Sequence, residues 1–119
     1  MATIELTKDS FLQTVEGNGI VLVDFWATWC GPCRMFAPVF EKVSEKYQDV
    51  IFGRVNTEEQ RDLAADYQIM SIPTIMVFRE KILVYRQAGA LPEKSLEELV
   101  KKVKELNMDE VRTEMAKDQ

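Results

Sequence analysis

The chain has 119 residues, two cysteines, no histidine and a formal net charge of −5 at pH 7. This length suits one domain with its own core, and the negative charge argues against nucleic acid as a partner. The absence of histidine excludes a cysteine–histidine dyad and removes the commonest general base and the commonest metal ligand.

Hydrophobic periodicity predicts strands that alternate with helices along most of the chain. Residues 20–26 form a near-continuous β-prone run, which predicts a strand buried on both faces. The order of the elements predicts an α/β fold, with a mixed five-stranded sheet and helices on both faces. The predicted elements are strand 3–6, a helix that Thr7 caps and Gly17 ends, strand 20–26, a helix from the cysteines to about residue 47, strand 50–55, helix 58–67, strands 74–78 and 82–87, and helix 92–106.

Two parts of the predicted fold are not decided by the sequence. Residues 79–81, Arg-Glu-Lys, join two strands without the Asn-Gly or Asp-Gly that is typical of a tight hairpin. Residues 107–119 form a C-terminal extension beyond the domain of residues 1–106. There Asn107 and Glu110 suit a capping pair for a short helix, and a frayed polar tail is the alternative.

The N-terminus lacks a basic segment followed by a long apolar run, which is the pattern of a signal peptide. No apolar stretch reaches the length of a membrane span. Two cysteines at this spacing are not the framework of a secreted disulfide-rich module. We therefore expect a cytoplasmic protein without a membrane partner.

Cys30 and Cys33 stand between the buried strand and the next helix. Their loop is too small for a disulfide that would brace the fold. At a helix start, unpaired backbone N–H groups and the helix dipole stabilise a thiolate on Cys30. Cys33, one turn further on, should face the protein and resolve a mixed disulfide. Pro32 suits the first turn because its missing N–H costs nothing there.

Asp24 lies inside the buried strand, six residues before Cys30. Burial should raise the pKa of this carboxyl group, which favours a role as proton acceptor for Cys33. The alternative is a structural ion pair with Arg54 on the next strand.

Charged residues are scarce around the cysteines and in residues 68–78. If the Ile72-Pro73 loop folds against the cysteine turn, the result is a nearly uncharged surface with Trp29 on its rim. Such a surface suits the docking of an extended polypeptide. Simple core packing is the alternative, and it accounts for Met70, Ile75 and Val77 but not for an exposed Trp29.

Four motifs together identify a family. They are Val-Asp-Phe-Trp-Ala-x-Trp-Cys-Gly-Pro-Cys at 23–33, Ala-Pro at 37–38, Ile-Pro-Thr at 72–74 and Ala-Gly-Ala at 88–90. In order and spacing, residues 3–106 resemble the thioredoxin family in its bacterial or organellar form. The resemblance implies the thioredoxin fold, in which the strands lie across the sheet in the order 3–6, 50–55, 20–26, 74–78 and 82–87.

By this resemblance Cys30 is the nucleophile, Cys33 the resolving thiol and Asp24 its proton acceptor. Two further sets of residues are implied. Those that support the active site are Gly31, Pro32, Pro73 with a cis peptide bond, and Arg54. Those that bind the substrate are Trp29, Ile72, Gly89 and Ala90.

The chain departs from the family pattern in three places. Arg54 replaces a usual lysine beside the buried aspartate, and an arginine keeps its charge more firmly. Lys81 replaces the usual glycine of the hairpin. The tail after Leu106 is longer than the family core requires.

The resemblance implies a general protein-disulfide reductase that a flavin-dependent thioredoxin reductase recharges with NADPH. We expect a monomeric electron carrier without bound cofactor or metal, whose redox-active group is the Cys30–Cys33 disulfide. Its partners would be the reductase and disulfide-containing proteins. Related oxidants and isomerases generally carry a histidine between the cysteines and an export signal, and neither occurs here.

Two other classes remain open. A non-catalytic interaction module would survive replacement of both cysteines by serine. Two thiolates are also half of a tetrahedral zinc site, whose other ligands would have to be carboxylates or come from a second chain.

Overall fold

The computed structural model describes residues 2–117; Met1, Asp118 and Gln119 lie outside the described residues. Within these bounds the chain forms five strands and five helices. In chain order they are β1 (Thr3–Glu5), α1 (Lys8–Gly17), β2 (Ile20–Trp26), α2 (Gly31–Lys46), β3 (Ile51–Asn56), α3 (Arg61–Asp66), β4 (Thr74–Arg79), β5 (Ile82–Ala88), α4 (Glu93–Glu105) and α5 (Met108–Lys117). No helix among residues 2–117 combines the length and the apolar character needed to cross a membrane.

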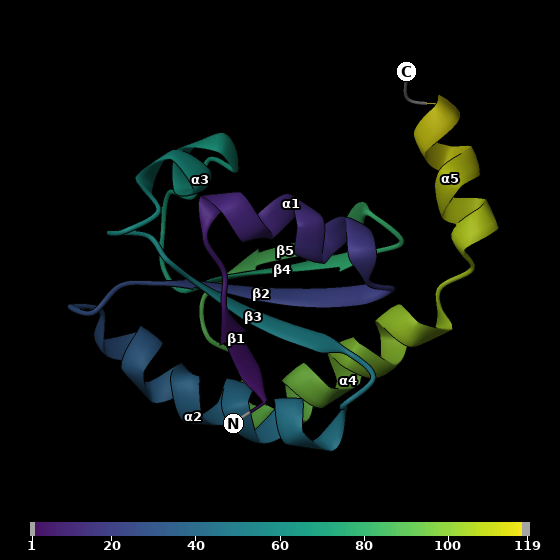
Figure 1. The fold of residues 1–119 in the computed structure, drawn as a ribbon. Helices are drawn as coiled ribbons and strands as arrows, with labels where there is room; N and C mark the ends of the chain where they lie inside the picture. Colours follow the sequence, from purple (N-terminus) through teal and green to yellow (C-terminus); the bar gives the residue numbers. More distant parts are fainter. Residues whose placement is uncertain (1, 118–119) are drawn as a thin grey trace.

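The five strands form one mixed sheet in the order β1-β3-β2-β4-β5. β3 runs parallel to β1 and β2, whereas β4 runs antiparallel to β2 and β5. Figure 1 shows α1 and α3 over one face of the sheet and α2 and α4 over the other. The predicted mixed sheet, its helical layers and its strand order are confirmed.

β2 is the central strand, and its side chains alternate between two cores. Val21, Val23 and Phe25 pack with residues of α1 and α3, whereas Leu22 packs with residues of α2 and α4. Because successive side chains of a strand point to opposite faces, Asp24 lies on the face of Leu22. The sheet therefore directs the only carboxylate of β2 toward the α2 layer.

The helix predicted over residues 58–67 is shorter in the structure, where α3 begins at Arg61. The Oδ1 atom of Asn56 accepts hydrogen bonds from the backbone N–H groups of Glu58 (2.9 Å) and Glu59 (3.4 Å). An asparagine side chain that binds the following backbone competes with helix formation and holds residues 57–59 in a turn. The prediction was therefore wrong at its N-terminal end.

The C-terminal extension forms α5, which lies beside the hairpin of β4 and β5. The Oδ1 atom of Asn107 accepts hydrogen bonds from the N–H groups of Asp109 (3.1 Å) and Glu110 (3.2 Å). Arg112 forms an ion pair with Glu80 of the hairpin at 2.6 Å. A groove of about 480 Å³ separates α5 from β5. Figure 1 shows α5 projecting beyond the end of α4.

The hairpin of β4 and β5 turns through two residues that both have positive φ angles. Glu80 has a φ of 49° and Lys81 a φ of 75°, and Arg79 pairs with Ile82 across the turn. The left-handed region costs a residue with a Cβ atom roughly 1 kcal/mol, and glycine avoids this cost. We therefore expect Lys81→Gly to raise the free energy of unfolding by about 1 kcal/mol, as measured by urea denaturation.

Lys81→Ala is the matched control for this prediction. Alanine removes the same charge but keeps the Cβ atom, so it should give no gain. Equal stabilisation by alanine and by glycine would show that the positive φ of Lys81 does not strain the turn. Glu80 stays unchanged in both variants because its carboxylate pairs with Arg112.

Candidate active site

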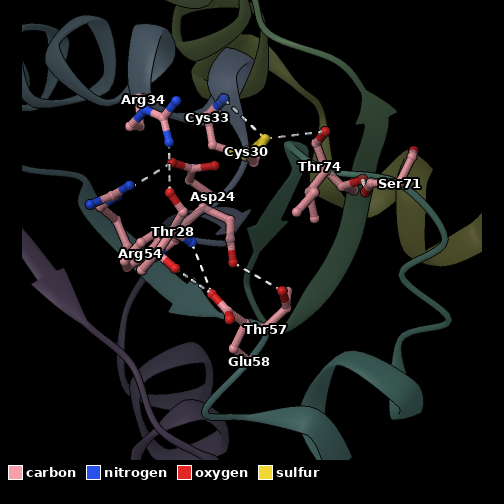
Figure 2. Close-up of a disulfide and its surroundings, with 12 residues drawn as sticks. Asp24, Thr28, Cys30, Cys33, Arg34, Arg54, Thr57, Glu58, Ser71 and Thr74 are labelled. Carbon is pink, nitrogen blue, oxygen red and sulfur yellow. Dashed lines mark hydrogen bonds and ion pairs between the residues drawn. A yellow bond between two sulfur atoms is a disulfide. The ribbon is translucent and has the colours of Figure 1, made fainter.

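The two cysteines form a disulfide at the point where β2 has ended and α2 begins. Cys30 is the N-cap residue of α2, and its Sγ accepts a hydrogen bond from the backbone N–H of Cys33 at 3.2 Å. Gly31 and Pro32 form the first turn of the helix, where Pro32 interrupts no intrahelical bond. The Cys30 sulfur therefore lies at the positive end of the helix dipole (Figure 2).

The two cysteines differ in their access to solvent. Cys30 is 4% exposed and Cys33 is 1% exposed, and both pack against Ala27, with Trp26 and Ile72 at the edge of this cluster. Cys33 lies inside the protein. Cys30 is the more accessible of the two cysteines.

A second loop closes against the cysteines. The Ile72–Pro73 peptide bond is cis, and the carbonyl oxygen of Ile72 lies 3.7 Å from Cys30 Sγ. The N–H of Gly89 donates to the Pro73 carbonyl oxygen at 2.8 Å. Gly89 has a φ of 101°, a conformation that residues with a Cβ atom rarely adopt. The structure thus links Cys30, Ile72, Pro73 and Gly89, and Ala90 follows Gly89 in the chain.

Asp24 is completely buried, and Figure 2 shows its carboxyl group on the side of the cysteine turn. Its Oδ2 accepts a hydrogen bond from Arg54 Nε at 3.3 Å, and its Oδ1 has no hydrogen-bond partner within residues 2–117. Burial raises the pKa of Asp24 to about 6, although the Arg54 charge and hydrogen bond lower it. The ion pair between Asp24 and Arg54, which was the alternative to a proton-acceptor role, is present, and the pKa of Asp24 is raised as well.

Arg54 reaches this carboxylate from β3, where it pairs in register with Asp24. Its guanidinium group stacks over the Trp26 ring, 4.4 Å from the centroid, and lies 4.0 Å from the Glu5 carboxylate. Stacking suits a planar guanidinium group, which keeps its charge at all accessible pH values. Arg54 therefore places a positive charge beside Asp24, but burial has the larger effect on the pKa of Asp24.

The surface around the disulfide carries exposed apolar side chains. Trp29 is 69% exposed, as predicted for the rim, and Met70 is 91% exposed. Both border a hollow of about 320 Å³. The core-packing alternative holds for Ile75 and Val77, which are buried, but not for Met70, which lies in the loop before the cis-proline. The other residues that line the hollow are Thr57, Ile69, Ser71 and Ile72.

Sequence reasoning missed Thr28 and the two side chains that bind it. Glu58 Oε1 accepts hydrogen bonds from the N–H (3.0 Å) and the Oγ1 (2.7 Å) of Thr28. From the other side, Arg34 Nη1 donates to the Thr28 carbonyl oxygen at 2.8 Å. No local pattern indicates the contact with Glu58, because it joins residues 30 positions apart.

The part of the chain that the structure describes contains no group of three histidine, cysteine, aspartate or glutamate side chains placed to hold a metal ion. A structural zinc site requires four such ligands. The two cysteines thus have no further ligands around them in this part of the chain to complete a zinc site.

Comparison with known proteins decides the family. The model of the thioredoxin family, described as Thioredoxin, matches residues 2–102. The chain belongs to the thioredoxin family. A putative thioredoxin 2 from Streptomyces coelicolor is 51% identical over 118 residues, which cover 99% of this chain and 88% of that protein. A thioredoxin from Porphyra purpurea is 43% identical and covers 86% of this chain and 97% of its own length.

A solved structure supports the same assignment. A mutant thioredoxin from Halobacterium salinarum NRC-1 superposes with a TM-score of 0.80 at 30% identity, over 88% of this chain and 92% of that chain. The thioredoxin fold predicted from the motifs is confirmed. The chain is a dithiol–disulfide oxidoreductase of the protein-disulfide reductase class, and its Cys30–Cys33 pair fits the family's Trp-Cys-Gly-Pro-Cys site.

Proposed function

We propose that this thioredoxin-family protein reduces disulfides with Cys30 as the nucleophile and Cys33 as the resolving thiol. The Cys30 thiolate attacks one sulfur of a substrate disulfide, and the other substrate sulfur leaves as a thiolate. The Cys33 thiolate then attacks Cys30 Sγ, which forms the Cys30–Cys33 disulfide and releases the second substrate sulfur. Two electrons pass to the substrate, whose thiolates take up protons from water. The observation that carries the proposal is the Cys30–Cys33 disulfide at the N-terminus of α2.

The helix start supports the role of Cys30. An anionic sulfur there is stabilised by the helix dipole and by the N–H group of Cys33, which points at Cys30 Sγ. Both cysteines are buried, and Cys33 is the less exposed of the two, at 1% against 4%. Cys30 therefore makes the first attack on a large substrate.

Asp24 is proposed as the proton acceptor of Cys33. With a pKa of about 6, the carboxyl group is mostly ionised at neutral pH and still basic enough to accept a proton from a thiol. Its Oδ1 atom has a lone pair available, because only Oδ2 binds Arg54. Arg54 supports the site by compensating the buried charge.

The apolar surface around Cys30 is proposed to bind the substrate polypeptide. Ile72 offers a backbone edge beside the reactive sulfur, which suits pairing with an extended chain. Trp29 offers an exposed aromatic ring on the rim. The proposed binding residues are Trp29, Ile72, Gly89 and Ala90, and the supporting residues are Gly31, Pro32, Pro73 and Arg54.

We propose that an NADPH-dependent thioredoxin reductase returns the Cys30–Cys33 disulfide to the dithiol. The protein then carries electrons, as a monomer in the cytoplasm, from the reductase to disulfide-containing proteins. The net negative charge of the chain supports the exclusion of nucleic acid as a partner. All residues of this proposal lie in the domain of residues 1–106, and the extension of residues 107–119 contributes none.

The decisive measurement is the equilibrium redox potential of the Cys30–Cys33 pair in a dithiothreitol or glutathione buffer. We expect a value more negative than that of the glutathione couple, which sets electron flow from this protein to its substrates. Insulin reduction coupled to thioredoxin reductase and NADPH should then proceed. A potential above that of glutathione would contradict the proposal and favour disulfide formation or isomerisation.

A further inference from the structure

The loop between β2 and α2, residues 27–30, carries Trp29 and is held from two sides at Thr28. Both hydrogen bonds from Thr28 to the turn before α3 end on one atom, Oε1 of Glu58. Arg34 of α2 donates to the Thr28 carbonyl oxygen. The backbone N–H, the backbone carbonyl and the hydroxyl of Thr28 all have partners, although Thr28 is exposed. Figure 2 shows Thr28 between Arg34 and Glu58.

The same turn also binds Trp26, the last residue of β2, directly before this loop. The N–H and Oγ1 groups of Thr57 donate to the Trp26 carbonyl oxygen at 2.8 Å and 3.0 Å. Hydrogen bonds from Thr28 lower the pKa of Glu58, so this carboxylate is ionised at neutral pH. The turn of residues 57–59 is thus attached to the chain on both sides of Ala27.

We propose that Glu58 is a positioning residue for protein substrates, because its two hydrogen bonds to Thr28 hold the neighbouring Trp29 in place on the docking rim. The inference rests on the docking role of Trp29 in the proposed function. It extends that function by assigning a part in it to a residue whose side chain binds Thr28 and not the cysteines.

The physical basis is preorganisation of the rim. Trp29 is 69% exposed, so few contacts of its own side chain restrict it. If substrate binding has to order a loop, the entropy cost lowers the affinity for the substrate. A loop that is already ordered avoids this cost. A substrate protein large enough to cover the rim should therefore depend on Glu58. A small disulfide that reaches only Cys30 should not.

The test compares two substrates with the full chain. We expect Glu58→Ala to lower kcat/KM for insulin reduction by about tenfold, mainly through KM. The rate with hydroxyethyl disulfide should fall by less than about twofold, and the redox potential of the Cys30–Cys33 pair should not change. Thr28→Val, which removes only the hydroxyl bond, should show part of the insulin defect, and Thr28→Ser should restore wild-type behaviour.

Two control variants separate the hydrogen bonds from the charge. Glu58→Gln keeps an amide oxygen that can accept both bonds from Thr28, so it should keep most of the insulin activity. Glu59→Ala removes a carboxylate from the same turn, and no side-chain hydrogen bond of Glu59 is present within the described residues. Its insulin activity should equal that of the wild type.

Equal losses with both substrates, or a shifted redox potential, would overturn the inference and place Glu58 in the geometry of the cysteines. Unchanged insulin kinetics in Glu58→Ala would overturn it as well. If the wild-type protein reduced hydroxyethyl disulfide but not insulin, the proposed function itself would be contradicted. The role of Glu58 would then be contradicted as well, because it depends on that function.

Discussion

Cys33→Ser is expected to trap the protein covalently on its substrates. The Cys30 thiolate still attacks a substrate disulfide, but no second thiol remains to release the adduct. Steady-state reduction of insulin should fall by roughly a thousandfold or more. Electrophoresis without reductant, followed by mass spectrometry, should show a mixed disulfide between Cys30 and one substrate cysteine.

Cys30→Ser is the matched control for this experiment. Cys33 is only 1% exposed, so it should form no adduct with a protein substrate. An adduct in Cys30→Ser that is absent in Cys33→Ser would reverse the two assigned roles. Replacement of both cysteines by serine tests the alternative of an interaction module, because a protein that only binds partners would keep its function.

Asp24→Asn is expected to stabilise the fold at neutral pH. Burial raises the pKa of Asp24 from 3.8 to about 6, so the folded protein binds this proton more tightly than the unfolded chain does. The stability that protonation contributes is complete below about pH 4 and is lost as the pH rises through about 6. Above about pH 7, the variant should exceed the wild type by about 2–3 kcal/mol in free energy of unfolding.

Urea denaturation over a pH series measures this difference. The curves of Asp24→Asn and wild type should converge below about pH 4, where the carboxyl group is neutral in both states. A constant difference between the two proteins from acid to neutral pH would contradict the raised pKa of Asp24.

The same variant should be slower in catalysis although it is more stable. Without the carboxylate, Cys33 lacks its proposed proton acceptor, and a general base contributes about a hundredfold or more to such a step. The release of substrate from the mixed disulfide should therefore slow by about a hundredfold near pH 7. Rapid-mixing measurements that follow tryptophan fluorescence can resolve this step.

The pH dependence of that step provides the control. In the wild type the rate should rise through about pH 6 as Asp24 ionises. Glu5→Gln should shift this rise to slightly lower pH at an unchanged plateau, because the Glu5 charge raises the pKa of Asp24. An unchanged rate and pH profile in Asp24→Asn would remove Asp24 from the mechanism.

Local sequence patterns were sufficient for most of the fold. The predicted strand at residues 20–26 matches β2, and Thr7 caps α1 through a hydrogen bond from the N–H of Ser10. Such patterns involve residues a few positions apart, so the sequence alone expresses them. The cysteine spacing, the adjacent buried aspartate and the Ile-Pro motif also predicted which residues the structure brings to one site.

The start of α3 could not be predicted from such local patterns. Helical spacing and acidic residues favoured a helix from residue 58, but the Asn56 side chain binds the backbone of Glu58 and Glu59 and delays the helix to Arg61. Met70 shows the same limit, because its hydrophobicity left core packing open as an alternative, whereas the loop exposes it.

By itself, the sequence determined the order of the elements, the buried central strand and the pair of cysteines at a helix start. Only the tertiary structure decided that Arg54 binds Asp24 while stacked on Trp26, and that Glu58 binds Thr28. These contacts depend on the register of β2 against β3 and on the path of two loops. The two hydrogen-bonded pairs join residues 30 positions apart, a separation that no local pattern of hydrophobicity or turn chemistry encodes.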